Sequence, residues 1–278
     1  MQQQYIAKTL QGLENVLAKE LETLGAKDVE VLKRAVSFSG DKAMLYAANI
    51  YLRTAIKILQ PLTTFRADDV QELYDQILAF NWSEVMDVDD TFTIDNTVFS
   101  TTFTHSNYAA LKMKDALVDH FRNKFGRRPD VNKLDPTYRF NIRIKENEVS
   151  IALDSSGESL HKRGYRTETH AAPMSEVQAA GLILLSGWDV NQPLYDPMCG
   201  SGTIPIEAAL IANQIAPGLI RKTYGFQKWK DYDASLFRQL MVAAAGEVQQ
   251  RRLAIIGSDI SSRNIVMAIK HAGNAMPE

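Results

Sequence analysis

A glycine-containing turn near residue 200 most constrains what this chain can fold into. The turn, Asp196-Pro197-Met198-Cys199-Gly200-Ser201-Gly202-Thr203, follows a short strand-like segment and precedes an apolar run over 204–213 that predicts a helix. Gly200 and Gly202 let the backbone turn sharply and approach a ligand, because neither residue carries a Cβ. A strand, a tight turn and a helix in this order are typical of a doubly wound α/β domain.

The residues of this turn favour one ligand class over two others. A dinucleotide fingerprint would need glycine where Pro205 stands, and a nucleoside triphosphate loop would need a Gly-Lys-Ser/Thr sequence that the turn lacks. An acidic residue at the strand end followed by Gly-x-Gly is instead the arrangement for S-adenosylmethionine. The helix N-terminus offers unpaired N–H groups to a carboxylate, with Thr203 as the expected N-cap. A second strand over 253–256 places Asp259 to accept bonds from ribose hydroxyls. A purely structural corner is the alternative.

Apolar spacing divides the chain into four ranges. Residues 1–62 predict the order strand, helix, strand, strand, helix, strand, which is typical of a ferredoxin-like unit. Residues 63–155 predict helices over 70–78 and 111–125, a strand from residue 92, and a hairpin around Glu146-Asn147. Residues 156–170 read as a polar linker. Residues 171–278 predict the α/β domain, with helices over 175–186, 204–213 and 263–272.

The charge is balanced overall but concentrated locally. The formal net charge is −2, whereas the segment from Lys112 to Lys145 carries ten basic and four acidic side chains. Such a segment can bind a polyanion through its local potential, although a solvated helix face would have the same composition. The candidate RNA contacts are Lys112, Arg127, Arg128, Lys133, Arg163 and Arg166.

The numbers and spacing of cysteines and histidines, and the lengths of apolar runs, exclude several classes of protein. A single cysteine excludes an intramolecular disulfide, and it favours a reducing, cytoplasmic location. The five histidines lack metal-ligand spacing, so we expect no metal. No apolar run approaches the roughly 18 residues of a membrane span. The oligomeric state is left open.

Two stretches of the sequence resemble a known family. Residues 196–208 (DPMCGSGTIPIEA) and 154–166 (DSSGESLHKRGYR) are similar to two motifs of the THUMP-domain-containing RNA methylases. Residues 216–219, 226–229, 52–55 and Trp82 also match that family. The resemblance implies a ferredoxin-like unit, a THUMP RNA-binding domain and a Rossmann-like methyltransferase domain. It implies methyl transfer from S-adenosylmethionine to an exocyclic base amine, with guanine N2 of 23S ribosomal RNA as the expected target.

The resemblance also suggests which residues hold the cofactor. Residues 172–176 lie where the family has its N-terminal cofactor motif, although Ser175 replaces the usual lysine. The expected cofactor contacts are Pro173, Glu176, Asp196, Pro197, Cys199, Gly200, Ser201, Gly202, Thr203 and Asp259. The family's catalytic Asn/Asp-Pro-Pro-Tyr loop is absent from these 278 residues. We therefore expect the sequence to be a fragment, and we assign no catalytic residue.

Two other functions fit parts of the sequence. An N6-adenine DNA methyltransferase shares these motifs, but the basic segment favours RNA. An RNA-binding module without activity would fit the absent loop. The modified nucleotide is left open.

Overall fold

The computed structural model describes residues 2–103, 106–168 and 174–276. The chain forms two compact units. Unit one contains residues 1–58, 158–223 and 233–278, and unit two contains residues 59–157 and 224–232. Both units are therefore assembled from segments that are separated in the sequence.

The first part of unit one has the order expected from the sequence. Its elements are β1 (Gln3–Lys8), α1 (Glu14–Thr23), β2 (Lys27–Leu32), β3 (Ala35–Gly40) and α2 (Lys42–Tyr51), and β4 (Lys57–Arg66) follows. The strand order is β2-β3-β1, with antiparallel pairing. Asp41 caps α2 by accepting a hydrogen bond from the Met44 N–H at 2.9 Å. Buried Tyr5 and Phe38 lie opposite each other on β1 and β3.

The second part of unit one is the expected α/β segment. It contains α5 (Glu176–Ser186), β9 (Leu194–Asp196), α6 (Thr203–Ala212), the short 3₁₀ helix η2 (Pro217–Leu219), α7 (Ala234–Gly246), β10 (Ile255–Gly257) and α8 (Ser262–Ala275). Strands β9 and β10 are parallel, and Asp196 lies opposite Gly257. The second strand begins two residues later than the sequence indicated, and α7 was not anticipated.

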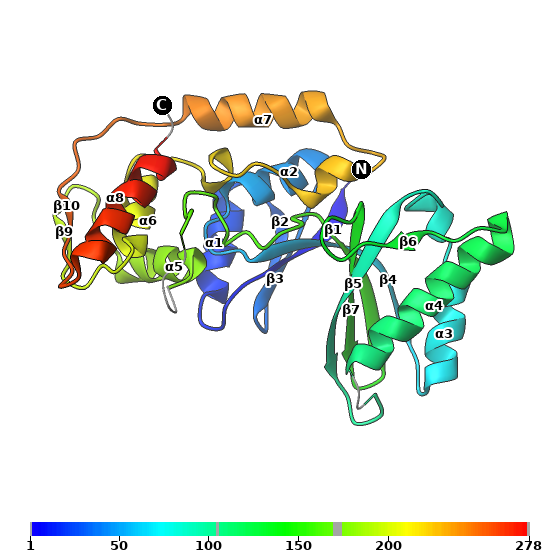
Figure 1. Cartoon of the computed structure of the whole chain (residues 1–278). Coiled ribbons are helices and arrows are strands. Elements are labelled where there is room, and N and C mark those ends of the chain that lie inside the picture. The colour runs from blue at the N-terminus through cyan, green and yellow to red at the C-terminus, as the bar shows by residue number, and fades with distance from the viewer. Residues whose placement is uncertain (1, 104–105, 169–173, 277–278) are drawn as a thin grey trace. The chain divides into compact units, whose positions relative to one another are not determined.

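The two parts of unit one share a hydrophobic core. Ile50 of α2 packs with Ala216 and with Ala244 of α7, and Figure 1 shows α7 beside α2. Leu13, which precedes α1, packs so closely on α5 that a Cβ at Gly181 would lie 2.5 Å from Leu13 Cδ1. The compact units thus follow a different division from the ranges predicted from the sequence, and those domain boundaries stay a prediction.

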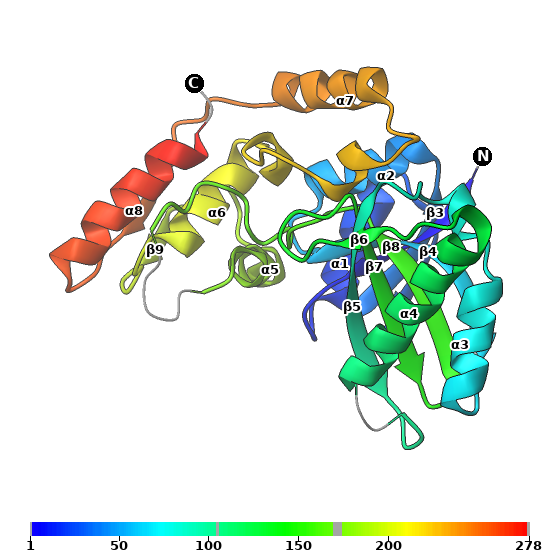
Figure 2. The same cartoon turned by 45° about the vertical axis from the view of Figure 1, so that its right-hand side comes forward.

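Unit two is a sheet with helices packed on one face. After β4 come α3 (Val70–Ala79), the 3₁₀ helix η1 (Trp82–Glu84), β5 (Thr91–Phe99), α4 (Ser106–Phe125), β6 (Asp130–Val131), β7 (Tyr138–Lys145) and β8 (Glu148–Asp154). The strand order is β4-β8-β7-β5-β6. Helices α3 and α4 lie side by side against the sheet (Figure 2). Trp82, Phe92 and Phe140 form an aromatic core. The predicted hairpin is confirmed, with Glu146 at φ +51° in its turn.

A late segment of the chain completes unit two. Residues 224–232 include the 3₁₀ helix η3 (Gly225–Lys228). The Phe226 N–H donates to the Ser155 carbonyl at 2.9 Å, and the Lys230 N–H donates to the Tyr138 hydroxyl at 3.1 Å. The Lys230 ammonium also donates to the Ser83 carbonyl at 3.1 Å. The segment is therefore fixed to both β7 and the loop around η1.

No helix in the described part of the chain is both long and apolar enough to span a bilayer.

Candidate functional site

Asp196 and Asp259 lie at the same edge of the β9–β10 pair. Asp196 ends β9 opposite Gly257, so Asp259 follows two residues beyond that register. The Asp259 carboxylate accepts a hydrogen bond from the Gly200 N–H at 3.0 Å through Oδ2. Its Oδ1 accepts from the Ser261 N–H at 2.8 Å and from Asn264 Nδ2 at 3.0 Å. The second strand therefore fixes the glycine turn through this carboxylate.

The two glycines of the turn are required for different reasons. Both have positive φ, +54° at Gly200 and +84° at Gly202, which disfavours any residue with a Cβ. A Cβ at Gly202 would lie 2.9 Å from Ala268 Cβ on α8, so this position needs glycine for packing. A Cβ at Gly200 would meet no atom within 4 Å. Gly200 thus borders open space beside the start of a helix, as a ligand-binding turn requires.

The start of α6 corrects one prediction. Gly202, and not Thr203, is the N-cap residue, and Thr203 is the first residue of the helix. The left-handed conformation of Gly202 ends the turn one residue earlier than expected. The Thr203 hydroxyl instead accepts a hydrogen bond from Arg166 Nη2 at 2.7 Å. The first N–H groups of α6 consequently have no side-chain cap and remain available to an anion.

Cys199 is held in the turn by packing. Its N–H donates to the Ser258 carbonyl at 2.9 Å, and its side chain is buried against the position of Gly257. Burial raises the pKa of the Cys199 thiol, and the nearby Asp196 and Asp259 carboxylates raise it further. The thiol is therefore a poor nucleophile, which fits a packing role.

Of the other expected cofactor residues, Pro197 and Ser201 differ in how they are exposed and contacted. Pro197 is exposed, and Ser201 is buried with its carbonyl 3.3 Å from His271 Nδ1. Pro173 lies outside the described residues. His271, buried on α8, was not singled out from the sequence, because a lone histidine without metal spacing gives no signal.

Glu176 presents a buried acceptor. It begins α5, is 3% exposed, and lies 3.5 Å from Arg166 Nη1 through Oε1. Its Oε2 is buried without a hydrogen-bond partner among the described residues. Burial raises the pKa of Glu176, and the Arg166 guanidinium opposes that rise. Glu176 is therefore a candidate acceptor for a cationic group of a ligand.

Residues 158–168 of the expected linker are packed into unit one. Arg163 is 2% exposed, donates to the Leu160 carbonyl at 2.6 Å and lies 3.6 Å from Glu207. The Tyr165 hydroxyl donates to Glu207 Oε1 at 3.1 Å. A buried guanidinium cannot reach a nucleic-acid backbone, so Arg163 is removed from the candidate RNA contacts. Arg166 is also turned inward, with a side chain 14% exposed.

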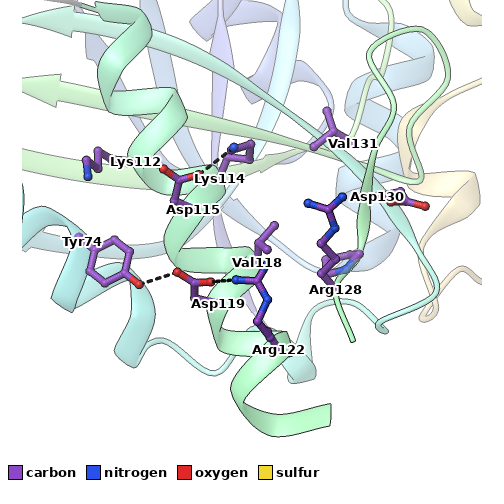
Figure 3. A pocket seen from close by; sticks show the side chains of 11 residues that line it. Tyr74, Lys112, Lys114, Asp115, Val118, Asp119, Arg122, Arg128, Asp130 and Val131 are labelled. Carbon is purple, nitrogen blue, oxygen red and sulfur yellow. Dashed lines mark hydrogen bonds and ion pairs between the residues drawn. The ribbon is translucent and has the colours of Figure 1, made fainter. Parts of the chain in front are cut away.

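The remaining basic candidates lie in unit two. Lys112 and Arg128 line a cavity of about 620 Å³ between α4 and residues 128–131 (Figure 3). The other lining residues are Tyr74, Lys114, Asp115, Val118, Asp119, Arg122, Pro129, Asp130 and Val131. Arg127 and Lys133 are exposed outside this lining.

Acidic neighbours neutralise only part of this basic surface. Lys114 pairs with Asp115 at 2.8 Å, and Arg122 pairs with Asp119 at 2.5 Å. Arg127 forms an exposed pair with Asp89 at 3.0 Å. Lys112 Nζ instead lies 6.0 Å from the ring centre of Tyr74 and 5.6 Å from that of Tyr108. The cavity thus combines cations with the ring of Tyr74, and Tyr108 lies beside Lys112 outside the lining; this combination suits a polyanion that carries bases.

Within residues 2–103, 106–168 and 174–276, no group of three or more His, Cys, Asp or Glu side chains is arranged to hold a metal ion.

Three family models match consecutive parts of the chain. The RlmL ferredoxin-like domain matches residues 4–59, the THUMP domain matches 67–154, and the RMKL-like methyltransferase domain matches 163–278. The chain is 40% identical to the ribosomal RNA large subunit methyltransferase K/L of Photobacterium profundum over 98% of this chain. It spans 39% of that relative's length.

Solved structures match over nearly the whole chain. A structure described as a predicted N6-adenine-specific DNA methylase from Listeria monocytogenes has a TM-score of 0.89 at 33% identity, and it covers 99% of this chain and 72% of that one. The SMU.472 structure, described as that of a methyltransferase complexed with SAH, has a TM-score of 0.88 at 31% identity, and it covers 98% of this chain and 72% of that one. TrmN from Thermus thermophilus shares the fold, with a TM-score of 0.65 at 17% identity over 98% of this chain and 69% of that one. The chain therefore belongs to the methyltransferase family that combines an RlmL ferredoxin-like domain, a THUMP domain and an RMKL-like methyltransferase domain.

Proposed function

We propose that this chain supplies the S-adenosylmethionine site and the RNA-binding unit of a ribosomal RNA methyltransferase. The observation that carries the proposal is the glycine turn, which Asp259 holds open at Gly200 beside the uncapped N-terminus of α6. The SAH complex of a relative 31% identical to this chain supports the same ligand class. When bound, the cofactor supplies an electrophilic methyl group.

Residues in and beside the turn fit three parts of such a cofactor: its carboxylate, its ammonium group and its ribose. The N–H groups at the start of α6 suit its carboxylate. The buried Oε2 of Glu176 suits its ammonium group, because an unpartnered buried acceptor gains a hydrogen bond there. Asp259 suits the ribose hydroxyls, since acidic residues at this position of related folds accept such bonds. The open space beside Gly200 leaves room for the ligand to approach the backbone.

RNA is the substrate class that unit two supports. Lys112, Arg128 and Tyr74 line its cavity, and Arg127 and Lys133 lie on exposed surface. Cations of this kind bind phosphates with little dependence on sequence, and the aromatic rings offer stacking surfaces. The curated relative acts on ribosomal RNA of the large subunit. We therefore infer that the substrate is 23S ribosomal RNA, methylated at guanine N2 in the cytoplasm.

The target base must leave its stack to meet the cofactor. A methyl group cannot reach an exocyclic amine inside a paired helix, so the base is extruded or taken from a single strand. The RNA-binding unit would contribute by recognising shape and backbone, because side chains read A-form RNA mainly through these features.

Methylation of DNA is the second candidate function, since the Listeria relative is described as a DNA methylase. The test uses the protein in its full natural length, methyl-labelled S-adenosylmethionine, unmodified 23S ribosomal RNA and unmethylated DNA. Label in N2-methylguanosine supports the proposal, and label in N6-methyladenine of DNA supports the alternative. Binding of RNA with no transfer to either substrate would leave an RNA-binding module.

A further inference from the structure

The segment from Glu158 to Arg166 ends in an arginine that contacts Thr203, the residue directly after the glycine turn. We propose that Arg166 is a positioning residue of this turn, holding Thr203 and Glu176 in place at the same time. The inference rests on the proposed S-adenosylmethionine site. It assigns Arg166 to the cofactor and away from RNA.

The contacts of Arg166 join three parts of unit one. Its Nη2 donates to Thr203 Oγ1 at 2.7 Å and to the Met174 carbonyl at 3.0 Å. Its Nη1 lies 3.5 Å from Glu176 Oε1. One guanidinium therefore links the first residue of α6 to the start of α5. The planar fork of arginine suits this task, because its donors point in fixed, diverging directions.

Arg163 and Tyr165 of the same segment, together with Arg53 from the N-terminal part, contact the rest of α6. Arg163 and Tyr165 both approach Glu207 in the middle of the helix. Arg53 donates to the Leu210 carbonyl at 3.3 Å and to the Ile215 carbonyl at 2.9 Å, just past the other end. Helix α6 is thus anchored along its length, and Arg166 is the anchor nearest the turn.

This anchoring has a consequence for ligand binding. The first N–H groups of α6 form an anion site only if the helix N-terminus keeps its orientation. Glu176 offers its free Oε2 only if Oε1 is held. A small displacement at either residue would weaken the ligand's contacts, because such sites depend on preorganised donors and acceptors.

The test compares four single variants, and the double variant Arg166→Met/Thr203→Val, in the protein at its full natural length. Arg166→Met removes all three contacts, Arg166→Lys keeps the charge but reaches fewer partners, and Thr203→Val removes only the hydroxyl acceptor. Lys162→Met is the matched control, since the Lys162 side chain is exposed on the same segment and pairs with the exposed Glu158. Calorimetry measures SAH affinity, fluorescence titration measures RNA affinity at several salt concentrations, and steady-state kinetics give KM for each substrate.

Positioning by Arg166 predicts a specific pattern. Arg166→Met should weaken SAH binding by about tenfold or more and raise the KM for S-adenosylmethionine, while RNA affinity and its salt dependence stay constant. Arg166→Lys should fall between wild type and Arg166→Met. The Arg166→Met/Thr203→Val double variant should bind SAH about as weakly as Arg166→Met alone, because Arg166→Met already removes the hydrogen bond to Thr203 that Thr203→Val breaks. Lys162→Met should match wild type.

Other patterns would overturn the proposal. Unchanged SAH affinity in folded Arg166→Met, with or without a lower Tm, would mean that the contacts serve stability alone. A loss of RNA affinity with a shallower salt slope would make Arg166 an RNA contact. If Arg166→Met does not fold, Thr203→Val alone tests the proposal. Wild-type SAH affinity in Thr203→Val would then show that the Arg166–Thr203 hydrogen bond does not position the cofactor site. If wild-type protein fails to bind SAH, the cofactor site itself is wrong, and this inference falls with it.

Discussion

The carboxylate of Asp259 accepts a hydrogen bond at 3.0 Å from the backbone N–H of Gly200, a residue 59 positions earlier in the chain. This bond joins the end of β10 to the turn that follows β9. The remaining oxygen is held by Ser261 and Asn264, so the carboxylate has a fixed orientation. Asp259 therefore has two roles in our proposal: it shapes the turn and it faces the ribose.

Asp259→Ala should weaken SAH binding by about tenfold or more, because a charge-assisted hydrogen bond contributes roughly 1.5–3 kcal/mol. Calorimetry on the protein at its full natural length measures the change. Asp259→Asn is the matched comparison, and it should retain part of the affinity, since the amide oxygen can still accept one bond. Wild-type affinity in Asp259→Ala would remove this residue from the site.

Alanine at the two turn glycines should separate binding from folding. Gly200→Ala has space for its Cβ, so we expect only the strain of a positive φ, about 1 kcal/mol, together with weaker SAH binding. Gly202→Ala places a Cβ 2.9 Å from Ala268, so its Tm should fall further. Thermal unfolding and SAH titration of both variants give the comparison. An equal fall in Tm for Gly200→Ala and Gly202→Ala would contradict the conclusion that only Gly202 is closely packed.

The larger clash of Gly202→Val should abolish SAH binding. Because α2 shares a core with α7 in unit one, we expect its effect on unfolding to extend into the N-terminal part. Unit two is compact by itself and should keep its own unfolding signal, read from the fluorescence of Trp82 and Trp229 in a Trp188→Phe background. Loss of that signal at the same temperature would show that the two units unfold together.

Arg127 and Arg128 should contribute to RNA binding through charge alone. Each contacted phosphate on a single strand contributes about −0.7 to the slope of log affinity against log salt. Replacing both residues with alanine should make the slope shallower by one to two such contacts, and binding should weaken similarly for different sequences. SAH affinity should not change. A wild-type salt slope in the double variant would show that Arg127 and Arg128 contact solvent and not RNA phosphates.

The Cys199 thiol should react with alkylating agents more slowly in the folded protein than in the unfolded chain at the same pH. Burial raises its pKa, with Asp196 adding to the rise, so the thiolate forms at higher pH than in an unfolded chain. The same shift means that this group's contribution to stability is complete at low pH and is lost as the pH rises. Mass spectrometry of the labelled peptide across pH gives the rate. Fast labelling at neutral pH in folded protein would contradict the burial.

Local patterns predicted the turn well. Glycines at 200 and 202, acidic residues after two strands and an apolar helix are signals carried by neighbouring residues. The order of elements in residues 1–66 followed from the same kind of periodicity. The cap at Thr203 was predicted wrongly, because residue preference could not show that the left-handed Gly202 is the N-cap and that Thr203 has Arg166 as its partner.

Long-range pairing accounts for what the sequence could not predict. Arg163 and Arg166 look like surface cations in a polar segment, and only the fold brings them to Glu207 and Glu176. Helix α7 did carry local signals that the prediction missed, because Asp233 caps it and Phe237, Leu240 and Met241 recur at helical spacing. The core that the N-terminal part and the α/β part of unit one share could not be predicted, because no local pattern in either part shows which residues of the other part it packs against.

The contribution of residues 224–232 to unit two has a consequence for synthesis on the ribosome. The chain leaves the ribosome N-terminus first, at about 5–20 residues per second. Unit two therefore waits several seconds after residue 157 for the segment that binds Tyr138 and Ser83. During that interval the nascent sheet lacks its last partner, and this is the period in which a chaperone or a translational pause would influence the yield of folded protein.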